Sequence, residues 1–188
     1  MKLTRLILLC SVLVCYCTIT TAQTETSGQQ GFSSSKIKKY RQLFWDSLPR
    51  PISWTNDYAW LFSTAQRNQL DSTISNFEKR TTVEISIVTL DTFCVSKEKF
   101  EDLALHIATT WRIGKKEKNN GILICICTGY RMIRIENGYG IENYLTDEET
   151  KEIIDTVFLP QYKKGDFFAG TNTGLNSIIS KLIEKNIH

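Results

Sequence analysis

The chain has 188 residues, of which 41% are hydrophobic and 23% charged, and its net charge at pH 7 is +3. Acidic and basic residues are interspersed, so the charge pattern gives no support for a nucleic-acid partner, and we expect none. The only histidines are His106 and His188, which argues against histidine-rich metal sites and against catalysis by several histidines. We expect a monomer.

Residues 1 to 22 have the pattern of a signal peptide. Lys2 and Arg5 precede an apolar run from Leu6 to Cys17, and small residues before Gln23 form a cleavage site near Ala22. An uncleaved membrane anchor is the alternative, but the apolar run is shorter than the ~20 residues that cross a bilayer. We therefore expect an exported protein, periplasmic or secreted.

Export would remove three of the six cysteines and leave Cys94, Cys125 and Cys127. Cys125 and Cys127 are two residues apart on a predicted strand, where both side chains point the same way and are badly placed to bridge each other. No disulfide framework is predicted. Cys125 and Arg131 have the C-x5-R spacing of cysteine-dependent phosphatases, but Cys125 lies inside the strand, so we interpret it as a buried thiol.

Residues 23 to 48 precede the predicted domain, which runs from residue 49 to 188. Residues 23 to 35 are small and polar, as in a tether. Residues 36 to 45, KIKKYRQLFW, mix basic and aromatic side chains. Such a segment suits an anionic membrane surface, but we expect a short helix that leads into the domain.

Two helices and a strand are predicted in the first half of the domain. Ser63 and Gln66 form a capping box for a helix that ends at Lys79. Residues 83 to 90 alternate and are rich in β-branched side chains, which is typical of a strand. Ser96 begins a second helix, which ends before Gly114. Its apolar face consists of Phe100, Leu103, Ala104, Ile107, Ala108 and Trp111.

A hairpin and two further helices are predicted in the second half. Residues 121 to 127 are continuously apolar, as in a strand covered on both faces, and residues 131 to 136 follow closely enough for a hairpin. Thr146 and Glu149 cap a helix that ends at Pro160, and Asp166 begins the last helix. This order predicts an α/β fold whose small mixed sheet has a parallel pair and an antiparallel edge strand.

The direction of the hairpin strands brings two loops together. If residues 121 to 127 run one way and residues 131 to 136 run back, Asn119 and Asn120 lie at the same end as the Gly-Tyr-Gly segment. The helix that begins at Thr146 starts at this end too, with free backbone N–H groups and the positive end of its dipole. The ligand-binding candidates are therefore Asn119, Asn120, Gly138, Tyr139, Gly140 and Thr146.

Carboxylates lie beside this corner. Glu142 and Asp147 bring side-chain oxygens, and the other loop brings amide and backbone carbonyl oxygens. Hard oxygen ligands favour Ca²⁺ or Mg²⁺ over zinc or copper. A purely structural interpretation stays open, because Asp147 and Glu148 are ordinary first-turn helix acids and Gly-Tyr-Gly alone makes a tight turn.

Four segments of the chain carry a resemblance to a known family. They are WTNDYAWLFS (54 to 63), WRIGKKEKNNGILI (111 to 124), RMIRIENGYGIENYLTDEE (131 to 149) and LPQYKKGDFFAG (159 to 170). Together they resemble the TPM domain, a family of thylakoid-lumen and exported bacterial proteins, and the resemblance covers about residues 49 to 184 in the family's order and spacing. It implies a three-layer α/β/α sandwich, divalent-cation binding in some members, and acid phosphatase activity in some plant members.

The resemblance adds Asp57 to the metal-ligand candidates, beside Glu142 and Asp147, because the family's N-terminal Asp falls on that position. The family commonly has Asp-Asn-Gly where this chain has Asn119 followed by Asn120 and Gly121. The missing carboxylate weakens the expectation of tight metal binding. The strand directions inferred above do not assign Asp57 to either end of the sheet.

Two functions of different classes follow. The first is a divalent-cation-binding or partner-binding module of the cell envelope, whose partner is a membrane or envelope protein. The alternative is a metal-dependent acid phosphatase acting on phosphomonoesters, in which Asp57, Glu142 and Asp147 hold the cation and Arg112 or Arg134 adds charge. The sequence identifies no nucleophile or general base, so we favour the binding module.

Overall fold

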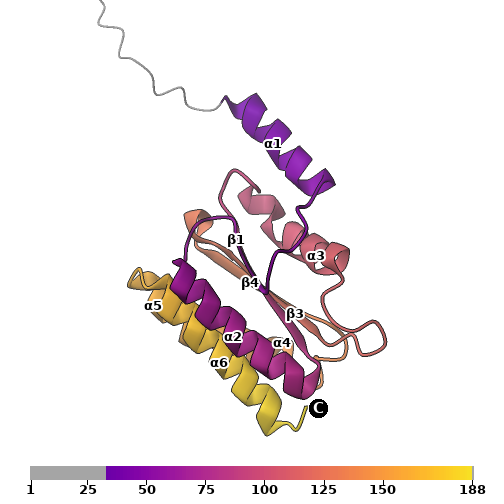
Figure 1. Cartoon of the computed structure of the whole chain (residues 1–188). Coiled ribbons are helices and arrows are strands. Elements are labelled where there is room, and N and C mark those ends of the chain that lie inside the picture. Colours follow the sequence, from indigo (N-terminus) through magenta and orange to yellow (C-terminus); the bar gives the residue numbers. More distant parts are fainter. Residues whose placement is uncertain (1–32, 188) are drawn as a thin grey trace, which may run out of the picture. The chain divides into compact units, whose positions relative to one another are not determined.

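A four-stranded mixed sheet lies at the centre of the fold (Figure 1). The structure, a computed structural model, describes residues 33 to 187, so the predicted signal peptide and most of the predicted tether lie outside it. The strands are ordered β1-β2-β3-β4. Their bounds are Thr55–Asp57 for β1, Glu84–Thr89 for β2, Gly121–Cys127 for β3 and Met132–Asn137 for β4.

The strand directions agree with the prediction. β2 and β3 are parallel, β3 and β4 are antiparallel, and β1 adds a further parallel strand on the other side of β2. β1 was not predicted, because its three residues, Thr55, Asn56 and Asp57, are polar and show no alternation. Only pairing with Ile87 to Thr89 makes this segment a strand.

Alternating side chains divide the core between the two faces of the sheet. On one face, isoleucines of β2, β3 and β4 pack against α2 (Thr64–Thr81), α4 (Asp147–Ile153) and α6 (Phe167–Glu184). On the other face, Leu123, Cys125 and Cys127 pack against α3 (Phe100–Trp111) and against the end of α1 (Ser34–Asp46). All seven residues of β3 are buried, as predicted. The described residues form a three-layer α/β/α sandwich.

The caps of α2 and α6 are those predicted from the sequence. Ser63 and Gln66 form the capping box of α2, and the carboxylate of Asp166 accepts from the Ala169 N–H at 2.9 Å. α3 differs from the prediction at its start. Ser96 makes no capping hydrogen bond to the backbone, and a 3-10 turn, Lys97–Lys99, leads into the helix.

The helix that begins at Asp147 does not end at Pro160, contrary to the prediction. A π-helical turn, η3 (Ile154–Phe158), follows α4, and α5 (Leu159–Lys163) continues beyond it. Pro160, which has no backbone N–H to donate to the preceding turn, lies in the first turn of α5. The wider turn therefore lets the chain remain helical through a proline.

α6 packs against this segment through two glycines. A Cβ atom at Gly174 would lie 2.2 Å from the Phe158 ring, and one at Gly170 would lie 2.6 Å from the Tyr162 ring. The Tyr162 hydroxyl is 2.7 Å from Thr171 Oγ1, and burial raises the pKa of Tyr162. Because these two residues are glycines, the Phe158 and Tyr162 rings can pack directly against the backbone of α6.

α1 is a short helix leading into the domain, as expected for residues 36 to 45. The Ser33 hydroxyl caps it, so the last residues assigned to the tether belong to the start of the helix. Phe44, Trp45 and Leu48 pack against the core on the α3 face. Among the helices of residues 33 to 187, none has the length and apolar character needed to cross a membrane.

A partly exposed ion pair at the start of α4 gives a pH-dependent contribution to stability. Both Glu149 oxygens accept from Lys185 Nζ, at 2.8 and 2.6 Å, and the backbone N–H of Thr146 donates to the same carboxylate. These hydrogen bonds, that of Lys185 first, lower the pKa of Glu149 to about 2. Because the pKa of Glu149 is lower in the folded than in the unfolded protein, these contacts stabilise the fold at any pH above the unfolded pKa of about 4.3. The stabilisation is lost as the pH falls from there towards 2.

We therefore expect Lys185→Met to destabilise the fold at pH 7 and to have no effect near pH 2. Urea unfolding midpoints measured between those pH values would show the difference closing below about pH 4. Lys151→Met is the control, because Lys151 pairs with Asp155 on the surface, where ion pairs contribute little. A Lys185→Met effect independent of pH would contradict the assignment.

Candidate functional site

The two loops predicted to meet do meet. β4 runs back along β3 so that Asn137 lies opposite Ile122. Beyond the hairpin, the Gly138 N–H donates to the Gly121 carbonyl at 2.8 Å, and the Gly140 N–H donates to the Asn119 carbonyl at 3.0 Å. The loop before β3 and the loop after β4 are therefore joined backbone to backbone.

Glycine is needed at this junction because of the close approach. A Cβ atom at Gly138 would lie 2.2 Å from the Asn119 carbonyl oxygen, and one at Gly140 would lie 1.9 Å from the Lys118 carbonyl oxygen. Both obstacles are backbone atoms, which cannot swing aside as a side chain can. We call this junction of residues 118 to 121 with residues 138 to 140 the glycine corner.

A pocket of about 770 Å³ opens beside the glycine corner, on the α3 face of the sheet. Its size is in the range of small-ligand sites. Tyr139 stands at its rim with 81% of its surface exposed. The lining combines the second half of α3, the following loop and the end of β4: Leu105, Ala108, Thr109, Arg112, Ile113, Gly114, Lys115, Lys116, Asn119, Gly121, Leu123, Glu136, Asn137, Gly138, Tyr139 and Glu142.

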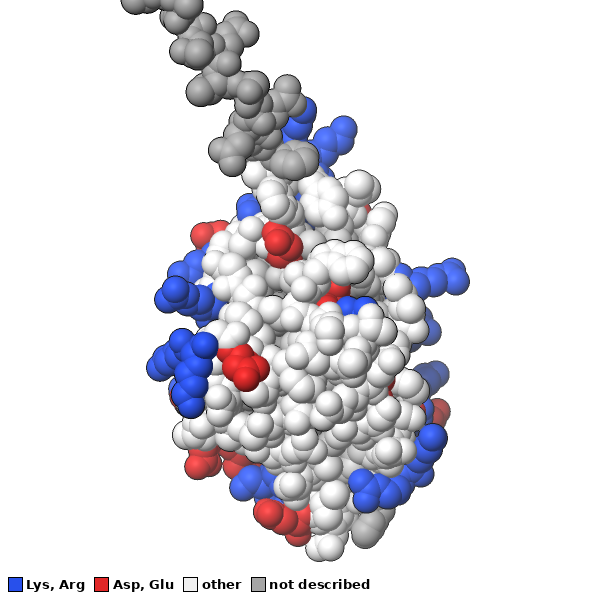
Figure 2. All heavy atoms as spheres, turned by 60° about the vertical axis from the view of Figure 1, so that its left-hand side comes forward, with Lys and Arg blue, Asp and Glu red and all other residues white. Residues whose placement is uncertain are grey.

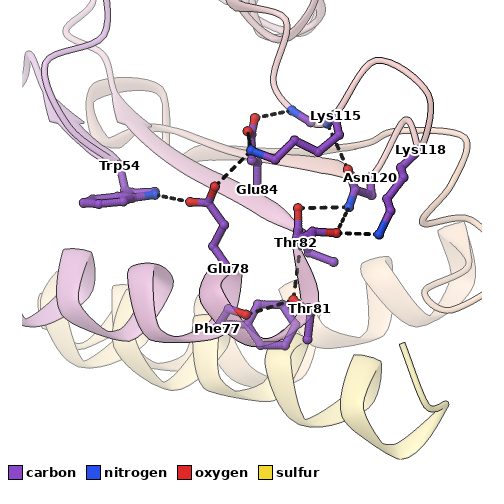
Figure 3. Close-up of polar contacts among 11 residues, drawn as sticks. Trp54, Phe77, Glu78, Thr81, Thr82, Glu84, Lys115, Lys118 and Asn120 are labelled. Carbon is purple, nitrogen blue, oxygen red and sulfur yellow. Dashed lines mark hydrogen bonds and ion pairs between the residues drawn. The ribbon is translucent and has the colours of Figure 1, made fainter. Parts of the chain in front are cut away.

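A polar network holds the loop after α3 in place (Figure 3). Lys115 Nζ bridges Glu84 and Glu78, and its hydrogen bonds to these carboxylates, Glu84 first, raise the pKa of Lys115. The second oxygen of Glu84 accepts from the Gly114 N–H at 2.7 Å, and Lys118 Nζ donates to the Thr82 hydroxyl at 2.8 Å. These contacts join the loop after α3, which lines the pocket, to the end of α2 and the start of β2.

Asn120 belongs to this network and not to the pocket. Its Nδ2 donates to the Thr82 carbonyl at 3.0 Å, and its Oδ1 accepts from the Lys115 N–H at 2.9 Å (Figure 3). The residue is only 5% exposed. Asn120 was predicted to bind a ligand, but its side-chain polar atoms are already hydrogen-bonded, and the residue stabilises the loop instead.

Four of the predicted residues line the pocket: Asn119, Gly138, Tyr139 and Glu142. Gly140 belongs to the glycine corner, beside the Lys118 carbonyl, but is not among the residues that line the pocket. The Thr146 hydroxyl accepts from the Glu149 N–H and caps α4. Asp147, exposed at the start of α4, is outside the lining. The hydrogen bond to Glu136 is the main cause that raises the pKa of Arg134, and the charge of Asp147 adds to it.

Asp57 lies at the opposite end of the sheet from the glycine corner. It is level with Thr89 at the end of β2, whereas Gly121 is level with Glu84 at the start of that strand. Five residues of strand separate the two levels by ~16 Å. One cation therefore cannot bind Asp57 together with Glu142, and the predicted set of three carboxylates is not assembled.

The Asp57 carboxylate has a structural role instead. Its side chain is 2% exposed, and its two oxygens accept from the Leu61 and Phe62 N–H groups at 2.9 Å each. The Thr89 hydroxyl also donates to it, and Arg67 lies 3.4 Å away. These contacts hold the turn between β1 and α2, in which Trp60 has a positive φ of 53° and is 85% exposed.

The residues at the corner fit a hard-oxygen cation in their chemistry. The Lys118 and Asn119 carbonyls face the corner, and Glu142 lines the pocket. Within residues 33 to 187, no three His, Cys, Asp or Glu side chains form a metal cluster. A cation here would therefore depend on carbonyl oxygens, which Ca²⁺ accepts more readily than Mg²⁺.

The cysteines and the histidine of residues 33 to 187 lie outside the pocket lining. Cys94, Cys125 and Cys127 are free, buried thiols, and burial is the main cause that raises the pKa of each. This confirms that Cys125 is a core residue. The His106 ring stacks on Trp45 with 4.3 Å between centroids, and its Nε2 is 3.0 Å from the Trp45 carbonyl oxygen.

Sequence reasoning missed the α3 wall of the pocket. Leu105, Thr109 and Glu136 were not among the predicted ligand residues. Leu105 carried a signal, because it is an apolar residue outside the predicted apolar face of its helix and is 54% exposed. The sequence carried no such signal for Glu136, because its place in the pocket depends on how far α3 extends over β4.

The family model of the TPM domain matches residues 55–181, which is more than half of the chain. The chain belongs to the TPM domain family. This match includes the glycine corner, the pocket and Asp57. A search of curated proteins found no match.

Three solved structures resemble this TPM domain. The N-terminal domain of a P. gingivalis protein is 29% identical, with a TM-score of 0.64, and the match covers 72% of this chain and 85% of that one. The BA42 protein of Bizionia argentinensis is 20% identical, with a TM-score of 0.55 and coverage of 65% and 82%. The N-terminal domain of the cg2496 protein of Corynebacterium glutamicum is 14% identical, with a TM-score of 0.51 and coverage of 72% and 83%. The last two show the shared fold alone.

Proposed function

We propose that this TPM domain is a binding module of the cell envelope, whose ligand site is the pocket beside the glycine corner. The observation that carries the proposal is the junction of two loops around a pocket of about 770 Å³. Its apolar wall of Leu105, Ala108 and Leu123 faces polar groups at the rim, the usual arrangement of a binding site. The predicted signal peptide supports export to the periplasm or the medium.

A Ca²⁺ ion at the corner is part of this proposal. Glu142 and the carbonyl oxygens of residues 118 and 119 would hold it, and Asp147 would supply a second carboxylate from the start of α4. The bound ion would fix the exposed Tyr139 loop and present it, with the pocket, to a partner protein.

Binding is better supported than hydrolysis of phosphomonoesters. Among its described lining residues the pocket has no Cys, His or Ser side chain, and the Thr109 hydroxyl donates to the Leu105 carbonyl at 2.8 Å. Arg134, one of the two arginines suggested for phosphate, is paired with Glu136 at 2.7 Å. Arg112, which has a φ of 54°, and Lys116 are exposed cations of the pocket lining that a ligand anion would meet.

The test is an NMR titration of the protein with CaCl₂. We expect shifts concentrated in residues 118 to 121 and 138 to 147, and we expect Glu142→Ala to weaken Ca²⁺ binding about tenfold or more, because it removes a charged ligand. Glu152→Ala, an exposed acid of α4 outside the corner, is the matched control. Shifts that avoid both loops, or equal losses in the two variants, would refute the site.

Phosphatase assays of the same samples separate the two functions. The binding module predicts no turnover of a phosphomonoester above background, with or without a chelator. Turnover that disappears with chelator and in both Glu142→Ala and Asp147→Ala would instead establish the metal-dependent phosphatase.

A further inference from the structure

The outer surface of α1 has a chemistry that the pocket does not explain. The helix is fixed to the domain on its inner side by Phe44 and Trp45. Arg41 reinforces this contact, because its Nη2 donates to the Thr92 carbonyl at 2.7 Å and to the Tyr130 hydroxyl at 3.0 Å. The rotation of α1 about its axis is therefore set, and so is the face that it turns outward.

That outward face combines cations with exposed apolar side chains. Lys36, Lys39, Tyr40 and Leu43 follow one another at the i, i+3, i+4, i+7 spacing of a single helix face. Tyr40 is 50% exposed and Leu43 is 60% exposed. These two large apolar side chains remain in contact with water unless another surface covers the helix face.

The charge of α1 is strongly one-sided. Its sequence has four basic residues and one acid, Asp46, which gives 4 − 1 = +3. Asp46 accepts a hydrogen bond from Gln42 at 2.9 Å. In Figure 2, which shares the vertical axis of Figure 1, Lys and Arg side chains project at the top, where α1 lies.

Another pocket, of about 390 Å³, lies against α1, and its lining is also rich in basic side chains. Lys38, Arg41 and Lys99 contribute to its lining, with Val95 and Leu103 among the apolar residues. Two acids are near: Asp102 pairs with Lys99 at 2.7 Å, and Glu98 is within range of the Arg41 and Lys97 charges. Lys38 is an exposed cation of this lining, available to an incoming anion.

We propose that α1 binds the surface of an anionic lipid bilayer, with Lys36 and Lys39 on headgroup phosphates and with Tyr40 and Leu43 in the interfacial layer. A bilayer offers phosphates directly above an apolar layer, which matches basic and apolar side chains on one helix face. An acidic protein surface offers the charge without the apolar layer. The helix lies on the membrane in this arrangement and does not cross it.

This surface is separate from the proposed ligand site. The two pockets share no lining residue, so the domain can bind a membrane through α1 and present the glycine corner to a partner at the same time. The membrane proposal is therefore independent of Ca²⁺ or partner binding at the corner.

The experiment is co-sedimentation of the chain from Gln23 to His188, which contains every residue of both cores, with lipid vesicles. Vesicles of phosphatidylcholine with about 30% phosphatidylglycerol should bind the protein, pure phosphatidylcholine should not, and high salt should release it. Lys36→Gln with Lys39→Gln should weaken binding about 30-fold, from the usual contribution of a basic residue near an anionic surface. Lys163→Gln with Lys164→Gln, an exposed pair at the C-terminal end of α5, should change it less than about threefold.

The apolar contribution has its own pair of variants. Leu43→Ser should weaken vesicle binding about tenfold, and Ile183→Ser, which removes a 47% exposed side chain from α6, should not change it. Equal binding to both vesicle types, equal losses in the α1 and α5 lysine pairs, or no vesicle binding would each overturn the proposal. Binding to polyglutamate without binding to vesicles would also overturn it, in favour of an acidic protein.

Discussion

Gly140→Ala is expected to destabilise the fold by about 3 kcal/mol, because the new Cβ atom would overlap a backbone carbonyl in a packed junction. The atom would lie 1.9 Å from the Lys118 oxygen, and the Gly140 N–H bond to Asn119 would have to lengthen to make room. Urea unfolding would measure the loss of stability. NMR shifts of residues 118 to 121 would show the two loops separating.

Gly165→Ala is the matched control for this substitution. Gly165 has a φ of +82° but no atom within 4 Å of an added Cβ, so only the backbone conformation resists the change. That strain amounts to about 1 kcal/mol. If Gly140→Ala lowered stability no more than Gly165→Ala, the glycine corner would not be the close junction described here.

Asp57→Ala is expected to destabilise the protein by about 3 kcal/mol and to leave Ca²⁺ binding at the glycine corner unchanged. The substitution leaves the Leu61 and Phe62 N–H groups and the Thr89 hydroxyl without their acceptor, and it removes the charge beside Arg67. Thermal and urea unfolding measure the first effect, and the CaCl₂ titration measures the second.

Asp155→Ala provides the comparison, because Asp155 is an exposed carboxylate whose ion pair with Lys151 contributes little. It should shift stability by less than about 0.5 kcal/mol. An Asp57→Ala protein that is as stable as wild type but no longer binds Ca²⁺ would show that Asp57 is a metal ligand after all.

The parts of this fold predicted from sequence are those specified by neighbouring residues. The capping boxes of α2 and α4 each depend on two residues three positions apart, and both are present. The hairpin follows from two apolar runs and a short turn, and its direction alone was enough to bring Asn119 to Gly140. Local patterns therefore located the glycine corner correctly.

The parts that were not predicted depend on distant partners. β1 is a strand only because β2 lies beside it, and without that pairing the end of the sheet that holds Asp57 could not be chosen. Asn120 was expected to face a ligand, but its side chain turns to Thr82, 38 residues earlier in the chain. A sequence pattern does not show which of two adjacent asparagines points inward.

The π-helical turn at Ile154–Phe158 has a consequence for variation in chain length. Such a turn holds one residue more than the α-helical turn it replaces. Deleting a single residue there would restore regular α-helical winding, and because the turn holds that one extra residue, the chain after it would keep nearly the same rotation relative to α4. The Tyr162 ring would then still face Gly170 on α6. This stretch should therefore tolerate the loss of one residue better than the regular helices α2 and α6, in which a deletion rotates everything after it by about 100°.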